Sequence, residues 1–401
     1  MPDDLQMQRR VRADIPFSHE KLDRLMDEAG LDVLLVTSKH NVQYLLGGHR
    51  AQFFSFMDAL GISRYLPILV YPKGAPEKAA FIGHRLERYQ IEVGSFWVPE
   101  MHAASSGSVD AMELAIEEIR RLGLASGRIG VERPFLPMDA AEALRTGLPQ
   151  ARIGEALVVL ERLRAIKGPE ELARLREASE RIIASMLAVI ARHGPGSTKR
   201  EIAEDLKREE VSRGLDFEYC LITAGSSLNR APSEEKWEMG EPLSLDSGGN
   251  YQGYIGDLAR MAVLGEPDGE LEELLGKVED VQQKVFRLIE PGRPGGELFA
   301  AASRALASLP EHNHVHFMAH GMGIISHEAP RLPTGGQMSY PAMDADRPLE
   351  PGMVLSVETT LAHPRRGFIK LEDTVAVTAS GREILGEGAR GWNRGGTAAR
   401  P

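Results

Sequence analysis

Four carboxylates stand inside strand-like, apolar runs in the second half of this chain, and they constrain its fold more than any other feature. Asp246 ends Leu243–Asp246, Asp257 lies within Gly253–Val263, Glu358 ends Met353–Glu358, and Glu372 lies within Ile369–Val377. A carboxylate is costly to bury in such a run unless a hydrogen bond, an opposite charge or a metal ion compensates it. Each acid alone is typical of the solvent face of a strand, so the argument depends on the four together.

The composition limits the class of protein. The chain has 401 residues, of which 42% are hydrophobic and 26% charged, and these values are those of a globular protein and exclude a disordered or fibrous one. The length allows roughly two or three domains of about 150 residues. Lys and Arg number 47 against 58 Asp and Glu, a formal charge of −11, which argues against a nucleic-acid partner.

Cysteine usage and the lack of targeting signals indicate the compartment. Cys220 is the only cysteine, so an intrachain disulfide and a thiolate metal cluster are excluded, as suits a reducing cytoplasm. The first 16 residues, MPDDLQMQRRVRADIP, lack the apolar segment of a signal peptide. No apolar run approaches the roughly 18 residues of a membrane span. We therefore expect a cytoplasmic protein with no membrane partner.

The first 165 residues alternate between strand-like and helical patterns. Val33–Val36 and Ile68–Tyr71 are typical of buried strands, and Ala79–Ile82 and Ile129–Val131 are weaker candidates. Val109–Leu122 has the spacing of a helix that ends at Gly123. These patterns predict an α/β domain over residues 1–165.

Residues 166–401 combine helices with antiparallel hairpins and are predicted to form a second domain. Gly168-Pro169-Glu170-Glu171 indicates a helix start, because Pro suits the first helical position and acids suit the first turn. Thr198 and Glu201 form a candidate capping box for a second helix, which ends near Gly214. A third helix is predicted from about Leu271 to Ile289.

Asp246 and Asp257 flank a Gly- and Asn-rich stretch, which indicates a hairpin. They are 257 − 246 = 11 residues apart, so we expect them to face each other across the ladder. Paired carboxylates repel at that distance unless a positive group lies between them. A divalent cation would meet this need; the alternative is that both acids are solvated turn residues.

Three histidines occur close together in His316-Phe-Met-Ala-His320-Gly-Met-Gly-Ile-Ile-Ser-His327-Glu-Ala-Pro. A strand that reaches His320, followed by a turn at glycine, could bring these imidazoles to one cavity. The alternative is a surface stretch, which the neighbouring His312 and His314 favour.

Taken together, these motifs resemble those of the pita-bread metallopeptidase family of creatinase, aminopeptidase P and prolidase. The family pattern Asp-x-Gly, Asp, Arg, His-x-x-Gly, His-Glu-x-Pro, Glu and Glu-Asp-Thr is matched in order along the chain, and the resemblance spans nearly all of it. It implies a mixed α/β fold, with a pita-bread catalytic domain over residues 166–401 after a creatinase-type N-terminal domain over residues 1–165. It also implies a homodimer.

The resemblance implies roles for individual residues. The implied metal ligands are Asp246, Asp257, His320, Glu358 and Glu372, holding two divalent ions (Mn, Co, Fe or Zn) per chain. Asp257 and Glu372 would bridge the ions, Asp246 would complete one side, and His320 with Glu358 would complete the other. Glu358 also matches the general base, and His316 and His327 match the histidines that bind substrate and stabilise the oxyanion. Ligands rich in oxygen favour Mn, Fe or Co over a structural zinc.

One position departs from the family. Asn229 stands where family peptidases usually carry a histidine, 246 − 229 = 17 residues before Asp246. An amide can donate hydrogen bonds but cannot exchange a proton near neutral pH. We therefore expect Asn229 on the substrate side of the cavity, where it bears on specificity.

The expected activity is hydrolysis of an amide bond by a metal-activated water, as in Xaa-Pro aminopeptidase or prolidase, with a small peptide as substrate. The alternative, which Asn229 favours, is a non-peptidase that acts on a small molecule, as creatinase, ectoine hydrolase and dimethylsulfoniopropionate lyase do. A third hypothesis, a non-catalytic binding module, conflicts with the presence of all five ligands.

Overall fold

The computed structural model describes residues 14–49, 65–88, 96–332 and 342–397. The chain divides into two compact units, Met1–Leu163 (unit 1) and Arg164–Pro401 (unit 2). Within the described ranges, no helix combines the length and the apolar character needed to cross a membrane.

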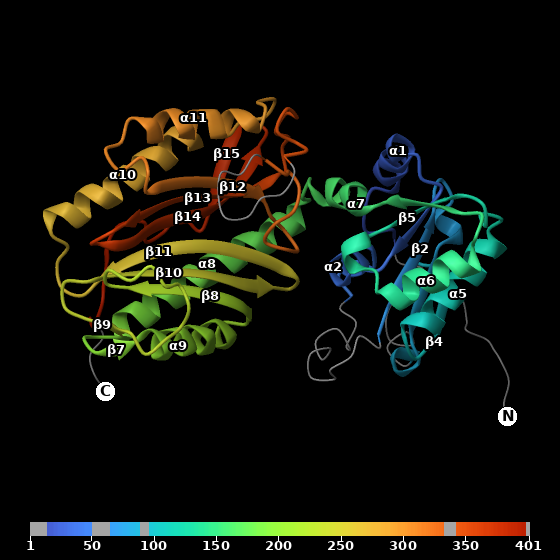
Figure 1. Ribbon diagram of the computed structural model, residues 1–401, viewed down its shortest axis with the longest axis horizontal. Coiled ribbons are helices and arrows are strands. Elements are labelled where there is room, and N and C mark those ends of the chain that lie inside the picture. The colour runs from blue at the N-terminus through green and yellow to red at the C-terminus, as the bar shows by residue number, and fades with distance from the viewer. Residues whose placement is uncertain (1–13, 50–64, 89–95, 333–341, 398–401) are drawn as a thin grey trace. The chain divides into compact units, whose positions relative to one another are not determined.

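Unit 1 is a six-stranded mixed sheet between two layers of helices (Figure 1). The strand order is β4-β3-β2-β1-β5-β6. The strands are β1 (Val33–Val36), β2 (Ile68–Pro72), β3 (Ala80–His84), β4 (Glu100–Ser105), β5 (Arg128–Val131) and β6 (Arg152–Glu155). The helices are α1 (His19–Ala29), α2 (Lys39–Leu45), α5 (Ser108–Arg121), α6 (Met138–Gly147) and α7 (Leu157–Arg164), with short 3₁₀ helices at Pro76–Lys78, Arg85–Glu87 and Arg133–Phe135.

The two faces of this sheet have separate cores, because side chains of a strand alternate between faces. Leu34 and Val36 pack with α1, α2 and α7, whereas Val33 and Leu35 pack with α5 and α6. A strand buried on both faces reads as a continuous apolar run, and the predicted strand at Val33–Val36 is confirmed for this reason.

Unit 2 contains an eight-stranded sheet with the order β12-β13-β14-β11-β10-β8, to which β15 adds at β14 and β16 at β11. Its strands are β8 (Asp216–Ala224), β10 (Pro242–Tyr251), β11 (Tyr254–Val263), β12 (Val315–Gly321), β13 (Val354–His363), β14 (Gly367–Thr378), β15 (Gly381–Leu385) and β16 (Asn393–Arg394). A second small sheet pairs β7 (Ser197–Thr198) with β9 (Lys236–Trp237). The helices are α8 (Pro169–Arg192), α9 (Lys199–Ser212), α10 (Gly269–Phe286) and α11 (Gly296–Ala307).

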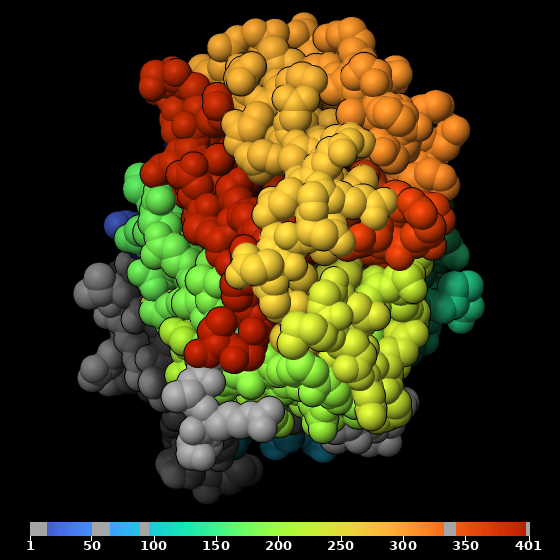
Figure 2. Space-filling model, turned by 90° about the vertical axis from the view of Figure 1, so that its left-hand side faces the viewer, coloured from blue at the N-terminus to red at the C-terminus, as the bar shows by residue number. Residues whose placement is uncertain are grey.

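Two helix pairs cover separate halves of this sheet (Figure 1). Helices α8 and α9 pack on β8, β10 and β11, and α10 and α11 pack on β12, β13 and β14. From the side, α10 crosses the surface next to the red C-terminal segment (Figure 2). Arg390 of that segment forms ion pairs and hydrogen bonds with Glu279 and Gln282 of α10.

The predicted helix starts agree with the caps that the structure contains. Glu171 accepts a hydrogen bond from the Gly168 N–H at 2.7 Å, and Thr198 and Glu201 form the reciprocal capping box of α9. Helix α10 begins at Gly269, two residues before the predicted start, because Asp268 accepts a hydrogen bond from the Leu271 N–H.

The predicted direct pairing of Asp246 with Asp257 is wrong. Tyr251 pairs with Tyr254, so Asp246 lies opposite Ala259, and Asp257 lies opposite Gly248. The turn forms at Gln252-Gly253, where both residues have positive φ, as a two-residue hairpin turn requires. The offset is two residues, and since the side-chain period is also two, both carboxylates still point to one face.

Glu210 of α9 gives the first prediction. It is fully buried and accepts a hydrogen bond from the Ser247 hydroxyl at 2.8 Å, and burial raises its pKa from 4.5 to about 8. Between these pH values the folded protein keeps a proton that the unfolded chain releases, so the free energy of unfolding falls as pH rises. We expect Glu210→Gln to flatten this fall, by on the order of a few kcal/mol between pH 5 and 8. Urea unfolding at several pH values measures it, and parallel profiles for variant and wild type would contradict it.

Candidate functional site

A cavity of about 760 Å³ opens on the face of the large sheet opposite the helices, and all its lining residues belong to unit 2. The five predicted ligands, Asp246, Asp257, His320, Glu358 and Glu372, all line it, as do His316 and His327. The sheet therefore brings together seven of the eight residues that the sequence indicates.

Strand register explains how distant residues meet. Glu358 on β13 pairs directly with Glu372 on β14, and Ala259 on β11 pairs with Glu372 on its other side. His320 lies on β12 opposite Ser356 of β13. Side chains at alternate positions of these strands share the cavity face, while the intervening ones enter the cores beneath α10 and α11.

Three of the ligand candidates form a tight group. Ligand atoms of Asp257, His320 and Glu372 lie within 4.8 Å of one another, and all three residues are buried. The Ser356 hydroxyl donates to Glu372 Oε1 at 2.6 Å, and the Tyr219 hydroxyl bonds to Asp257. His320 Nδ1 lies 3.3 Å from the Gly321 carbonyl oxygen, and its buried Nε2 has no hydrogen-bond partner among the described residues.

The electrostatics of this group favour a bound cation. Burial and the neighbouring Glu372 and Asp246 raise the pKa of Asp257 well above its usual value, and burial also raises that of Asp246. Burial lowers the pKa of His320 to about 4, so its imidazole is neutral at pH 7, the form that binds metals. A nearby positive charge would relieve the cost of the clustered carboxylates.

Two cationic side chains that the sequence analysis missed lie in the cavity. Lys370 Nζ is 2.6 Å from Asp246 Oδ2, 2.5 Å from Glu358 Oε2 and 2.7 Å from Glu372 Oε2. Arg230 also forms an ion pair with Asp246. Burial lowers the pKa of Lys370, but the three carboxylates outweigh it and raise that pKa well above its usual value. The signal was available, because Lys370 precedes Glu372 by two residues and must share its face.

The remaining predicted residues have different placements. The His327 ring stacks on that of His320, with centroids 3.8 Å apart and an angle of 11° between the planes. His316 lines the cavity on β12 and is exposed.

Asn229 is not among the residues that line the cavity, although its neighbours Leu228 and Arg230 are. It is exposed; its carbonyl accepts from Lys199 Nζ at 2.5 Å, and its side-chain Oδ1 accepts from the Ala231 N–H at 3.1 Å. The amide caps a local turn, so the expected place on the substrate side belongs to Arg230.

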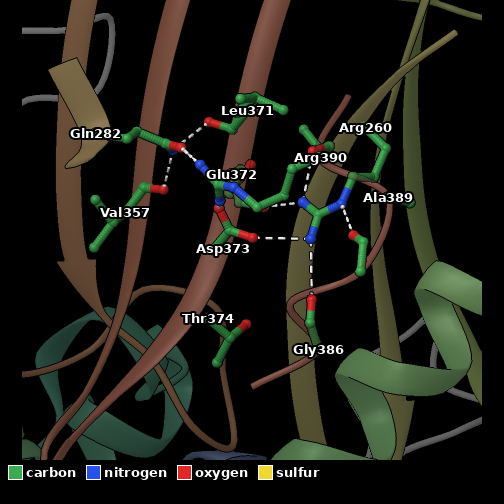
Figure 3. A network of polar contacts seen from close by, with 12 residues as sticks. Arg260, Gln282, Val357, Leu371, Glu372, Asp373, Thr374, Gly386, Ala389 and Arg390 are labelled. Carbon is green, nitrogen blue, oxygen red and sulfur yellow. Dashed lines mark hydrogen bonds and ion pairs between the residues drawn. The ribbon is translucent and has the colours of Figure 1, made fainter. Parts of the chain in front are cut away.

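A network on the opposite face of the sheet holds the ligand strands together (Figure 3). Arg260 donates to the Glu372 carbonyl at 2.8 Å and to Asp373 Oδ1 at 2.8 Å. Gln282 of α10 donates to the carbonyls of Val357 and Leu371, at 2.9 and 2.7 Å. The backbones of β11, β13 and β14 are thereby fixed next to Asp257, Glu358 and Glu372.

Comparison with known proteins places this site in a family. The model of metallopeptidase family M24 matches residues 173–379. The chain belongs to metallopeptidase family M24. The model of the creatinase/prolidase N-terminal domain matches residues 19–166. Membership implies that divalent metal ions bind here.

Curated relatives and solved structures agree with this. The chain is 26% identical over 374 residues to the uncharacterized peptidase YqhT of Bacillus subtilis, covering 91% of this chain and 96% of the relative. It is 24% identical over 373 residues to the Xaa-Pro dipeptidase of Pyrococcus horikoshii, covering 91% and 95%. The recombinant prolidase of Thermococcus sibiricus superimposes with a TM-score of 0.79 at 20% identity, covering 95% and 99%; at this identity the likeness shows the fold.

The residues present fit a divalent cation. Two carboxylates and a neutral imidazole converge within 4.8 Å, and His320 Nε2 is a buried atom that otherwise has no hydrogen-bond partner in the described chain. This donor set suits Mn, Fe, Co or Zn. The fit is to Asp257, His320 and Glu372 first, because Asp246 and Glu358 are already held by Lys370.

The second prediction follows from this group. We expect Asp257→Ala or Glu372→Ala to remove most of the bound divalent metal, because each deletes a carboxylate that nothing nearby can replace. Metal content per chain after dialysis, measured by mass spectrometry, tests this. Glu383→Ala, which removes an exposed acid of the same unit on β15, is the matched control and should keep wild-type metal content. Full occupancy in the Asp257 and Glu372 variants would show that the ligands are wrongly assigned.

Proposed function

We propose that this protein is a metal-dependent hydrolase that cleaves the amide bond before proline in small peptides, as an Xaa-Pro dipeptidase or aminopeptidase. The observation that carries the proposal is the buried group of Asp257, His320 and Glu372 at the base of a cavity wide enough for a peptide. Membership of a metallopeptidase family and relatives named Xaa-Pro dipeptidase support it.

The proposal extends to the parts that the sequence indicates. Residues 166–401 are the catalytic domain and residues 1–165 the creatinase-type domain, in a cytoplasmic homodimer. Asp246 and Glu358 join the three clustered residues as candidate ligands, and the five together have enough donor atoms for the two ions of the family. How many ions this chain holds depends on Lys370, as argued in the next subsection.

The roles of the chain's own groups follow from their contacts. A bound divalent ion supplies a water of lowered pKa and polarises the scissile carbonyl. Glu358 is the general base: Lys370 holds its Oε2, so Oε1 is the atom that takes the proton. Burial lowers the pKa of His327 to about 4, so the ring is neutral. With the Ser326 hydroxyl 3.0 Å from Nδ1, His327 can present its Nε2–H to the developing oxyanion.

The outer cavity suits an apolar residue that carries a carboxylate. Leu228, Met318 and Phe368 supply apolar surface, and the Arg230 guanidinium lies 4.9 Å from the centre of the Phe368 ring. A proline ring could pack on this surface while its carboxylate binds Arg230. Because Asn229 lies outside the cavity, the observation that favoured a non-peptide substrate does not bear on the pocket.

A substrate screen tests the proposed function. Metal-loaded protein is incubated with an Xaa-Pro dipeptide, the same dipeptide as its C-terminal amide, an Xaa-Ala control, and small amide, guanidino and sulfonium compounds. We expect cleavage of the Xaa-Pro dipeptide, with kcat/KM for the amide lower by about 10- to 100-fold, since a hydrogen bond to a charged group is worth about 1.5–3 kcal/mol. Turnover of a non-peptide compound alone would overturn the proposal in favour of that substrate class.

The third histidine of the motif provides the next prediction. His327→Ala should keep the metal and lose about 100- to 1,000-fold in kcat, the usual loss for an oxyanion donor. Metal content and kinetics are measured on the same preparation, so loss of metal is distinguished from loss of chemistry. His312→Ala, at an exposed position outside the cavity lining, is the control and should match wild type. Unchanged turnover for His327→Ala would remove this residue from the mechanism.

A further inference from the structure

Lys370 occupies the centre of the carboxylate cluster in the way a bound cation would. Its Nζ contacts Asp246, Glu358 and Glu372, at 2.6, 2.5 and 2.7 Å, and these side chains come from three different strands. An ammonium group has three N–H donors, so each donor has one carboxylate. The lysine side chain is 4% exposed, so water does not compete for these contacts.

Asp246 is neutralised by protein groups alone. Its Oδ2 contacts both Lys370 Nζ and the Arg230 guanidinium. In the family pattern this aspartate serves only one of the two ions. The part of the site that would hold that ion therefore already contains two positive charges.

The other side of the cluster contrasts with this. Asp257, His320 and Glu372 converge within 4.8 Å, and His320 Nε2 is buried with no hydrogen-bond partner among the described residues. The carboxylates of Asp257 and Glu372 supply oxygen donors from β11 and β14, and the imidazole comes from β12. These residues still need a cation.

The charges agree with a single ion. Asp246, Asp257, Glu358 and Glu372 carry four negative charges, and Lys370 and Arg230 return two, which leaves −4 + 2 = −2. One divalent ion cancels this remainder. Two divalent ions would leave a net charge of +2 in a buried site, and a buried charge without a partner is strongly disfavoured.

We propose that Lys370 takes the place of the second divalent ion, so that this chain binds one ion, on Asp257, His320 and Glu372. The inference depends on the proposed function, because it presumes that the site binds a divalent metal. It changes the role of Asp246, which becomes the partner of Lys370 and Arg230 and not a metal ligand. Lys370 also fixes Glu358 beside the ion, with its charge in place before substrate arrives.

The test counts ions and examines their coupling. The full-length protein is stripped with chelator, titrated with Mn²⁺ and studied by calorimetry and electron paramagnetic resonance. We expect a single Mn²⁺ per chain and the six-line spectrum of an isolated ion, even with Mn²⁺ in excess. A second ion with an exchange-coupled spectrum in wild type would overturn the inference and leave the proposed function standing. Absence of any bound ion would count against both.

Variants at position 370 show whether the lysine charge is the cause. Lys370→Met keeps much of the side-chain volume and removes the charge, so it should bind a second Mn²⁺ and give the coupled spectrum. Lys370→Arg, which keeps the charge, and Lys277→Met on α10, which removes a lysine outside the cavity, should both retain one ion. A single ion in folded Lys370→Met would overturn the role of the lysine. If that variant does not fold, the wild-type count decides.

Discussion

The buried ion pair between Arg260 and Asp373 holds together the two strands on which the candidate site depends. Both side chains are fully buried, and removing one partner of such a pair typically costs about 3–5 kcal/mol. Arg260 lies three residues after Asp257, and Asp373 follows Glu372, so the pair fixes β11 against β14 on the face opposite the cavity. Arg260 also binds the Glu372 carbonyl, and Gln282 ties β13 to β14 in the same layer (Figure 3). The ligand geometry is thus set by groups that never enter the cavity.

The cavity differs from the rest of unit 2 in how it compensates buried acids. Glu328 is also fully buried, but Lys167 and Arg164 bind its two oxygens at 2.8 and 2.9 Å. Although burial raises the pKa of Glu328, these two cations outweigh it and lower that pKa below its usual value. Asp257 has no such pairing and its pKa is raised well above the usual value. The fold therefore neutralises an acid completely where it serves structure, and leaves a deficit of positive charge where an ion is to bind.

Local patterns in the sequence predict much of this fold, and long-range register explains what they miss. The caps at Gly168 and Thr198 and the apolar run Val33–Val36 depend on neighbours within a few residues, and the structure contains them as predicted. Strand β4, by contrast, is the largely polar run Glu100–Ser105, and its place beside β3 depends on contacts far along the chain. The site residues share one cavity as expected, yet Lys370 and Arg230 were missed because a charged side chain beside a ligand reads as solvent-exposed until pairing shows what it faces. Asn229 was given too much weight for the same reason: spacing alone cannot show that its amide caps a turn.

The separation of the two sheet faces explains how this family can keep its fold while its sites change. The outer face carries the packing of α8 to α11 and the Arg260 network, so substitutions there threaten stability. The cavity face carries charges whose sum must stay near zero, and this sum can be met by ions or by side chains. A single change at position 370 alters that sum by one unit without touching the core, because Ile369 and Leu371 on either side make the apolar contacts. A fold that superimposes on a prolidase at 20% identity can therefore hold its metal in a different way.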